Sequence, residues 1–365
     1  MTGYYVLLYP LSDFESGVYN KIQAQVKAFN AAGLETKILT CNCYARNYFS
    51  KIIKAFSPSS IVRTISNNFF SNDFYYFRYS GADIIPLLGL LKKIKQYKRN
   101  KVIFEIPTYP SLKEGQSGFS KIRRLINRIF IGQLKKYVDI ITTFSVDDVI
   151  FGIRTIKIIN GIDISKIPII KKAISKVAPL NLIAVANYHK WHGYDRLLEG
   201  LKKYYEQRNI LKIHLHFVGN GAELDFYKKL VSEYELSEYV IFYGILLGEE
   251  LDNVYNKTDI AVSSLGSHRI NIHLTSALKS KEYLARGIPM VSSTKIDVLP
   301  DGFKYCLYVP ENDSPIDIQS VVQFYFDLLE KKDISYITHD IRRFAEKHCD
   351  MSITMMPVIN YICQV

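Results

Sequence analysis

The sequence has little tryptophan and cysteine, and both shortages limit what the chain can be. Its 365 residues contain one Trp and five Cys. The odd number and scattered positions of the cysteines argue against a disulfide framework, so we expect reduced thiols in a cytoplasmic protein. Cys41 and Cys43 lack a second ligand pair at zinc spacing, and no metal site is predicted.

Long apolar runs are also missing. The first run, Tyr4 to Pro10, has only seven residues and follows no basic segment. It is too short for a signal peptide or a membrane span, which needs about 18 apolar residues or more, and it fits a buried parallel strand. We expect a chain that does not cross a membrane.

The glycine fingerprint of dinucleotide-binding proteins is absent after this strand. Only Gly17 stands between the strand and the next helical segment, and no G-x-G-x-x-G occurs there. This argues against an NAD enzyme. Gly17 either lets a ligand approach the start of the helix or only relieves a turn.

Positive charge is abundant and unevenly placed. Residues 1–170 hold 24 of the 47 basic and 11 of the 35 acidic residues, which leaves 23 basic and 24 acidic residues in the remainder. The excess predicts an anionic partner for the first half: a membrane surface, a phosphorylated acceptor or nucleic acid.

Apolar strands and amphipathic helices alternate in both halves of the chain. This pattern predicts an α/β protein with two Rossmann-like, doubly wound domains that face a cleft. We expect a first domain at 1–165, a linker at 165–179, a second domain at 180–345, and a final helix at 346–365 that crosses back to the first domain.

Two strand ends in the second half carry residues suited to a nucleotide. His189 to Gly193 (HKWHG) places Lys190 and His192 before a helix, where cations suit a diphosphate. His192 could instead be a surface residue, and no Cys or carboxylate completes a metal site with the two histidines. Gly219, Asn220 and Gly221 follow a strand as a glycine turn that either admits a ligand or only turns the chain.

A third segment, Ser276 to Ser293, predicts a short helix with Lys279 in its first turn. A cation is unfavourable there because the helix dipole is positive at that end, and a nearby anion would offset the cost. The amides near Leu278 would face phosphate, and Glu282 would accept hydrogen bonds from a ribose. The alternative is a solvated pair of Lys279 and Glu282, which contributes only about 0.2–0.5 kcal/mol.

These segments together resemble the GT-B glycosyltransferases, in particular the retaining, group 1 or family 4-like enzymes of bacterial capsules and exopolysaccharides. The resemblance rests on these stretches: NGID (Asn160–Asp163), HGYDRLLEGL, HFVGNGAEL, VIFYG, DIAVSSLG and LKSKEYLARGIPMV. In that family an E-x7-E motif precedes A-x-G-x-P, and its second Glu, which holds the donor ribose, corresponds to Glu282. The first Glu is replaced by Leu274. Asn187 and His192 stand at the usual Arg and Lys, and Lys190 could supply the missing charge.

The resemblance implies a transfer of sugar from a UDP- or GDP-sugar, without a metal ion, to a glycan or lipid-linked acceptor of bacterial surface polysaccharide. Lys190, His192 and Lys279 would stabilise the departing diphosphate. The donor-binding residues would be Gly17, Gly193, Gly219, Asn220, Gly221, Ser276, Leu278 and Glu282.

The acceptor is expected on the first domain. Arg78, Glu105 and Tyr109 stand at strand ends there, although each could be structural. Tyr48 to Phe70 and Ser120 to Tyr137 are basic and amphipathic, and they predict peripheral binding to the inner face of the plasma membrane; a solvated surface is the alternative.

Four other functions fit parts of the sequence. A nucleotide-sugar epimerase or an inverting GT-B enzyme would share the donor site. A catalytically silent subunit that binds a nucleotide-sugar would tolerate Leu274. A nucleic-acid binder fits the charge, but no motif that reads a groove supports it.

Overall fold

The computed structural model divides the chain into two compact units. Unit 1 is Met1–Gly161 with Met351–Val365, and unit 2 is Ile162–Asp350. The structure describes residues 1–8, 17–40, 57–58, 62, 67–79, 83–97, 100–107, 109, 125–171, 179–208 and 211–364. Cys41, Cys43, most of the basic stretch at 48–70 and residues 120–124 lie outside this part. No described helix has both the length and the apolar character that a bilayer crossing requires.

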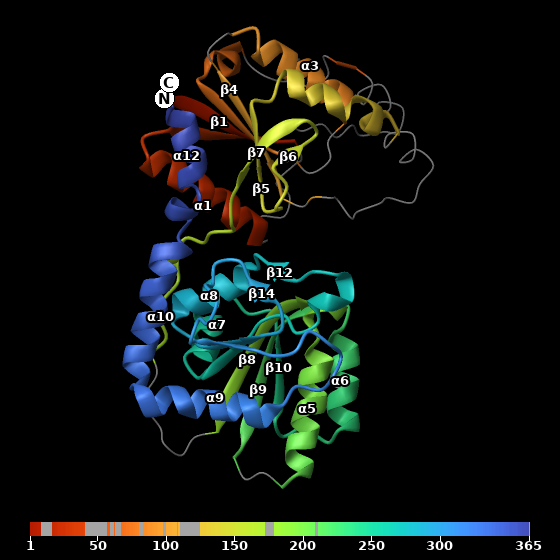
Figure 1. Ribbon diagram of the computed structural model, residues 1–365, viewed down its shortest axis with the longest axis vertical. Helices are drawn as coiled ribbons and strands as arrows, with labels where there is room; N and C mark the ends of the chain where they lie inside the picture. Colours follow the sequence, from red (N-terminus) through yellow and green to blue (C-terminus); the bar gives the residue numbers. More distant parts are fainter. Residues whose placement is uncertain are drawn as a thin grey trace. The chain divides into compact units, whose positions relative to one another are not determined.

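Unit 1 is built on a seven-stranded sheet in the order β2-β1-β3-β4-β5-β7-β6 (Figure 1), parallel except for the last pair. Its strands are β1 (Thr2–Leu7), β2 (Glu35–Thr40), β3 (Phe74–Arg78), β4 (Lys101–Ile106), β5 (Ile140–Thr143), β6 (Val149–Ile150) and β7 (Ile153–Lys157). Its helices are α1 (Gly17–Ala31), η2 (Asn67–Ser71), α3 (Ile84–Ile94), a helix at 125–130, η3 (Ile131–Lys136), α11 (Met351–Thr354) and α12 (Met356–Cys363).

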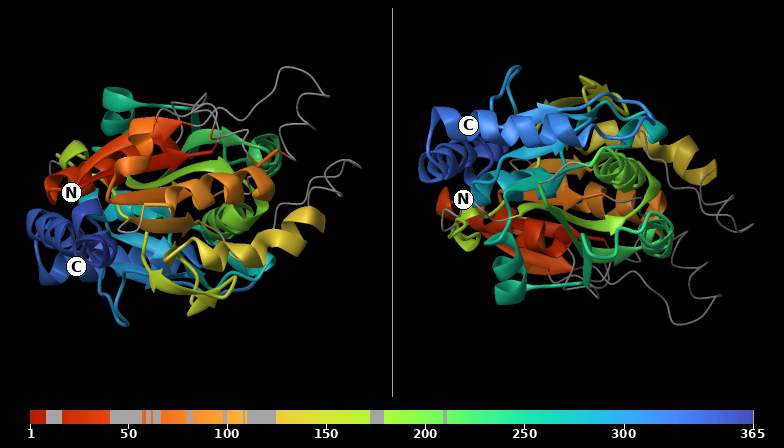
Figure 2. Two further views of the ribbon diagram at one scale, coloured as in Figure 1. Left: turned by 90° about the horizontal axis from the view of Figure 1, so that it is seen from above. Right: turned by 90° about the horizontal axis from the view of Figure 1, so that it is seen from below.

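Helices cover both faces of this sheet. Apolar residues of α3 and η3 pack on one face, and those of α1, α11 and α12 pack on the other. Ile22, Val26 and Phe29 recur at helical spacing in α1 and are buried, whereas Val18, one turn before Ile22, is exposed. Both termini therefore belong to unit 1 and lie close together (Figure 2).

Unit 2 contains a parallel six-stranded sheet in the order β10-β9-β8-β11-β13-β15 and a small parallel pair, β12-β14. The strands are β8 (Leu180–Tyr188), β9 (Ile213–Gly221), β10 (Val240–Gly244), β11 (Ile260–Val262), β12 (Leu274–Thr275), β13 (Met290–Ser292), β14 (Lys295–Ile296) and β15 (Cys306–Tyr308). The helices are η4 (Ile164–Lys166), η5 (Lys190–His192), α5 (Tyr194–Glu206), α6 (Leu224–Glu233), α7 (Gly248–Tyr255), η6 (Ser267–Ile270), α8 (Leu278–Arg286), α9 (Ile318–Lys331) and α10 (Ile334–His348).

The second sheet is also covered on both faces. Apolar residues of α5, α6 and α9 form the core on one face, and those of α7, α8 and α10 form it on the other (Figure 1). Ile170, in the segment expected to be a linker, is buried in this core, and its amide donates to the carbonyl of Arg286 at 3.0 Å. The two parallel, helix-covered sheets confirm the predicted α/β class of two doubly wound domains.

The glycine turn predicted at residues 219–221 is wrong. Strand β9 continues through Gly221 and pairs with β8 as far as Tyr188. A Cβ atom at Gly219 would collide with the carbonyl oxygen of Ala186, and one at Gly221 with the backbone of Tyr188. The φ angles of these glycines, 125° and 145°, are also ones that other residues rarely adopt. Both glycines are thus explained by the close approach of two strands.

Candidate functional site

A pocket of about 520 Å³ lies in unit 2, where three segments meet. The end of β8 with η5, the segment from β11 through η6, and the first turn of α8 supply its walls. In open parallel sheets, ligands bind beyond the carboxyl ends of the strands, and β8 and β11 lead into this pocket. Its polar lining residues are Asn187, His189, His192, Ser264, Ser267, Thr275 and Lys279.

Lys279 brings a cation to the pocket that no carboxylate neutralises among the described residues. Its Nζ donates to the Tyr194 hydroxyl at 3.0 Å and lies 5.3 Å from the centre of that ring. Desolvation lowers the pKa of Lys279 to about 7. The α8 N-cap residue, Ala277, offers no side-chain hydrogen bond to the first amides, whose dipole further disfavours the ammonium. An anion bound here would relieve both costs.

His192 is neutral at physiological pH, which corrects the expected cluster of cations. Burial and the nearby Lys279 lower the pKa of His192 to about 2. Its Nδ1 accepts the backbone N–H of His189 at 3.0 Å, so the ring proton resides on Nε2. His192 therefore offers a neutral N–H donor at the pocket wall instead of a charge.

Lys190 contributes less to the pocket than the sequence predicts, and Arg196, near the start of α5, is an interior residue. Lys190 is exposed and does not line the pocket. Arg196 is buried, and its guanidinium donates to backbone carbonyls, among them Pro310 at 2.9 Å and Ser314 at 2.7 Å. A donor contact by Lys190 stays a prediction, while Arg196 has a structural role.

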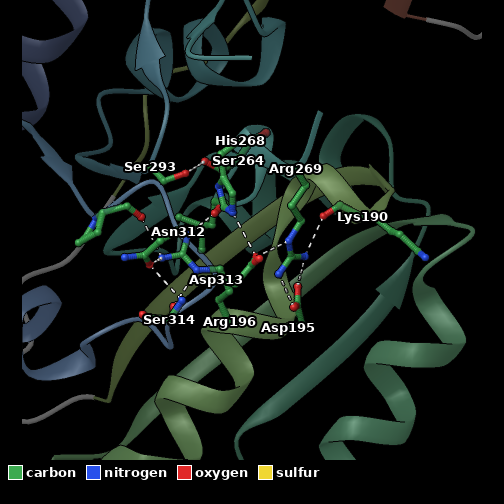
Figure 3. A network of polar contacts seen from close by, with 12 residues as sticks. Lys190, Asp195, Arg196, Ser264, His268, Arg269, Ser293, Asn312, Asp313 and Ser314 are labelled. Atoms are coloured by element: carbon green, nitrogen blue, oxygen red, sulfur yellow. Dashed lines mark hydrogen bonds and ion pairs between the residues drawn. The ribbon is translucent and has the colours of Figure 1, made fainter. Parts of the chain in front are cut away.

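Arg269, which the sequence did not single out, fastens two walls of the pocket together (Figure 3). Its guanidinium pairs with both carboxylate oxygens of Asp195, at 2.9 and 2.7 Å, and with Asp313 at 2.7 Å. It also donates to the carbonyl of Lys190 at 3.0 Å. These acids raise the pKa of Arg269. The ion-pair network thus fixes η6 to η5 and to the start of α5.

Gly193 permits the close packing of the same two segments. It has a φ of 64°, and a Cβ atom there would lie 2.5 Å from the amide nitrogen of Gly266. Any larger residue would push η5 away from the segment after β11. Gly193 does not line the pocket, but it allows two of the segments that do to pack closely together. Gly219, Asn220 and Gly221 do not line the pocket either.

The predicted donor residues of α8 divide between two environments. Leu278 lines the pocket, and Ser276 precedes the helix, where its hydroxyl accepts from Lys281 at 3.4 Å. The Glu282 carboxylate pairs with Arg286 at 3.0 Å and does not line the pocket. Lys279 and Glu282 therefore do not form the surface pair considered above, and the ribose contact of Glu282 stays a prediction.

The acceptor-side residues of unit 1 are largely interior. Glu105 is fully buried, pairs with Arg78 and accepts hydrogen bonds from Lys21 at 3.1 Å, Gln25 at 2.8 Å and Tyr76 at 2.8 Å. These partners outweigh burial and lower the pKa of Glu105 to about 2. Arg78 and Glu105 therefore make structural contacts within the core, the alternative considered for them, and their contact with an acceptor stays a prediction.

Tyr109 and Gly17 are described residues whose neighbours in the sequence lie outside the described part. Tyr109 is half-buried, and its ring packs edge-on against Phe151 with centres 5.7 Å apart. Gly17 is the first residue of α1, and residues 9–16 before it lie outside the described part. Substrate contacts by these two residues stay predictions.

A known family matches part of the sequence, and solved structures match the fold. Residues 166–304 match the family described as "Glycosyl transferases group 1". Among curated proteins, none matches the chain significantly in sequence. Similar solved structures include HepE of Anabaena in complex with UDP (TM-score 0.66, 11% identity, 100% of both chains) and the sucrose-phosphate synthase of Thermosynechococcus elongatus (0.63, 14%, 99% of both). A third is the apo form of the lipopolysaccharide outer core galactosyltransferase WaaB (0.60, 14%, 99% of both).

At these identities the structural likeness establishes the fold, which is GT-B, with two parallel sheets in two domains. The family match covers most of unit 2. It includes η5, η6 and α8, which all contribute residues to the pocket. With a glycosyl transferases group 1 match over residues 166–304 and the GT-B fold around it, the chain is a glycosyltransferase.

Proposed function

We propose that this enzyme transfers a sugar from a UDP- or GDP-sugar to a glycan or lipid-linked acceptor in the synthesis of bacterial surface polysaccharide, with retention at the anomeric carbon. The observation that carries the proposal is Lys279, a desolvated ammonium in a pocket at the start of a helix, whose hydrogen-bond partner among the described residues is a phenol oxygen. A half-buried, desolvated cation of this kind matches the diphosphate of a nucleotide-sugar.

In the proposed reaction, the bond between the anomeric carbon and the diphosphate oxygen breaks, and its electron pair leaves with the diphosphate. A bond forms between the anomeric carbon and the acceptor hydroxyl oxygen, whose proton passes to the departing oxygen. The Lys279 ammonium, the Nε2–H of His192 and the first amides of α8 would stabilise the negative charge that develops. We propose that these groups serve in place of a metal ion.

Two similar structures support the choice of donor and pathway. HepE is described in complex with UDP, and WaaB is described as a lipopolysaccharide outer core galactosyltransferase. Leu274, exposed beside the pocket segment, favours the second candidate, a silent subunit that binds a nucleotide-sugar without turning it over.

Turnover separates the two candidates. Incubated with a panel of UDP- and GDP-sugars and a lipid-linked acceptor, the enzyme is expected to release nucleoside diphosphate and form a glycosylated product with unchanged anomeric configuration. A chelator should leave the rate unchanged, because Lys279 and the helix amides supply the charge. Tight donor binding with no product from any acceptor would instead identify the silent subunit, and inverted product would refute retention.

We further propose that unit 1 binds an anionic membrane surface. On the helix at 125–130, the side chains of Leu125, Ile129 and Phe130 are 59%, 62% and 40% exposed. Large apolar side chains are usually buried. Arg128 on this helix and Lys135 with Lys136 after it are exposed as well. Apolar side chains interleaved with cations are typical of an interfacial helix.

An Ile129→Asp variant is expected to lose membrane affinity. Removal of the apolar group and addition of a negative charge should weaken sedimentation with anionic liposomes about tenfold or more. Val146→Asp introduces the same charge at a residue of unit 1 that is 74% exposed, and serves as the control. Equal loss in both variants would show that net charge alone, and not this helix, directs binding.

A further inference from the structure

None of the described residues that line the pocket is an acid, and one part of the wall is strongly apolar. Trp191, Ile270, Ile272 and Leu278 are its largest apolar residues. Sugar hydroxyls are held by groups that accept or donate hydrogen bonds, which isoleucine side chains cannot do. This wall therefore suits a part of the ligand that carries no hydroxyl.

Ile270 and Ile272 are 38% and 36% exposed, and the backbone holds them in place. The chain turns at Asn271, whose φ is 56°. The amide of Asn271 donates to the carbonyl of His268 at 2.9 Å, and that of Ile272 donates to the carbonyl of Ser267 at 3.1 Å. The two isoleucines are thus presented by a hydrogen-bonded turn at the pocket.

Arg269 fastens this turn to the rest of the site. Because its guanidinium pairs with Asp195 and Asp313 and donates to the carbonyl of Lys190, the turn cannot fold away to bury its isoleucines without breaking these bonds (Figure 3). An apolar surface held in advance loses little conformational freedom when a ligand covers it. The wall is therefore prepared for an apolar group.

The same pocket holds Lys279 and the start of α8, so its ligand needs an anion as well as an apolar group. We propose that the transferred sugar carries a methyl group, in a 6-deoxy sugar or in an acetamido substituent, that packs against Ile270 and Ile272. This inference rests on the proposed function, since it assumes a nucleotide-sugar in this pocket.

Matched ligands test it on the full-length protein by calorimetry. UDP and GDP are measured alone, followed by UDP-glucose against UDP-N-acetylglucosamine and GDP-mannose against its 6-deoxy form. A methyl group in an apolar pocket should improve affinity about tenfold in one of these pairs, and the pair that responds identifies the source of the methyl group. If a nucleoside diphosphate binds but neither pair shows a preference, the inference is overturned and the proposed function stands. If neither nucleoside diphosphates nor nucleotide-sugars bind, the proposed function itself fails.

Variants locate the preference. Ile270→Asn and Ile272→Asn should abolish the tenfold preference and leave the affinity for the nucleoside diphosphate unchanged, because both side chains are partly exposed and the turn keeps its backbone bonds. Ile245→Asn, at a residue 69% exposed outside the pocket, is the matched control and should retain the preference. If the isoleucine variants weaken the bare nucleotide equally, the wall holds the base and the inference is wrong.

Discussion

In a Lys279→Met variant, affinity for a nucleotide-sugar is expected to fall about 100-fold, since truncation of one charged partner in a desolvated contact typically costs about 2–5 kcal/mol. Methionine keeps the approximate length of the side chain but removes the ammonium next to Tyr194. Isothermal titration with a UDP- or GDP-sugar measures the loss. The effect should exceed that of any other lysine in unit 2, because no other lysine and no arginine lines the described pocket.

Stability should change in the opposite direction. Burial disfavours the charged form of Lys279, so an apolar replacement removes a cost that only an anionic ligand offsets. Without ligand, the variant should unfold at a higher urea concentration than the parent protein near neutral pH. Lys295→Met, at a lysine half-exposed and paired with Asp301, is the control and should alter neither property. Weaker binding with lower stability would instead indicate a damaged fold.

Binding should also depend on pH through Lys279. Its pKa of about 7 means that the free protein loses the ammonium above neutrality. Affinity for a nucleotide-sugar, whose diphosphate does not titrate there, should be flat below about pH 6.5 and fall about tenfold per unit above about pH 7.5. The folded pKa lies below the unfolded value of 10.5, so this residue makes the free energy of unfolding rise with pH between the two. In Lys279→Met both dependences should disappear.

Much of this architecture can be predicted because its signals are local. Leu197, Leu198 and Leu201 recur at helical spacing and are all buried in α5. Lys279 was detectable because a cation in the first turn of a helix conflicts with the dipole, and the structure places it at the pocket. Such a conflict can be recognised in a single sequence because the unfavourable contact, a cation at the start of a helix, is local. The residues that complete the pocket come from distant parts of the chain and cannot be recognised in this way.

The rest depends on pairings that no local pattern encodes. Arg269 lies in the short 3-10 helix η6 and bonds Asp195 and Asp313, which are 74 and 44 residues away. Glu105 was expected to face an acceptor because it ends a strand. Its register beside Arg78 on β3, with Lys21 reaching in from α1, buries it instead. The sequence predicts that Glu105 lies near the end of a strand, but it does not predict which side chains of neighbouring elements bury it.

The cluster around Glu105 predicts the largest loss of stability in unit 1. In a Glu105→Gln variant the side chain keeps its shape, but Lys21 and Arg78 lose the buried carboxylate with which both pair. Removal of one partner from a buried ion pair destabilises by about 3–5 kcal/mol, and we expect this loss in urea unfolding of the full chain. Glu35→Gln, an exposed residue paired with Lys37, should change stability by only about 0.5 kcal/mol or less.

Acid should reproduce this loss in the parent protein. The folded pKa of Glu105, about 2, lies below its ordinary value of 4.5, so its contribution is complete above that value and is lost as pH falls through about 2. The Glu105→Gln variant should lack this part of the acid dependence. Lys21 is desolvated, which lowers its pKa to about 8. Adding Lys21→Met to Glu105→Gln removes this buried cation and should therefore recover part of the lost free energy of unfolding. Additive losses in the double variant would mean that hydrogen bonds from Gln25 and Tyr76, and not charge compensation, make Glu105 essential to this core.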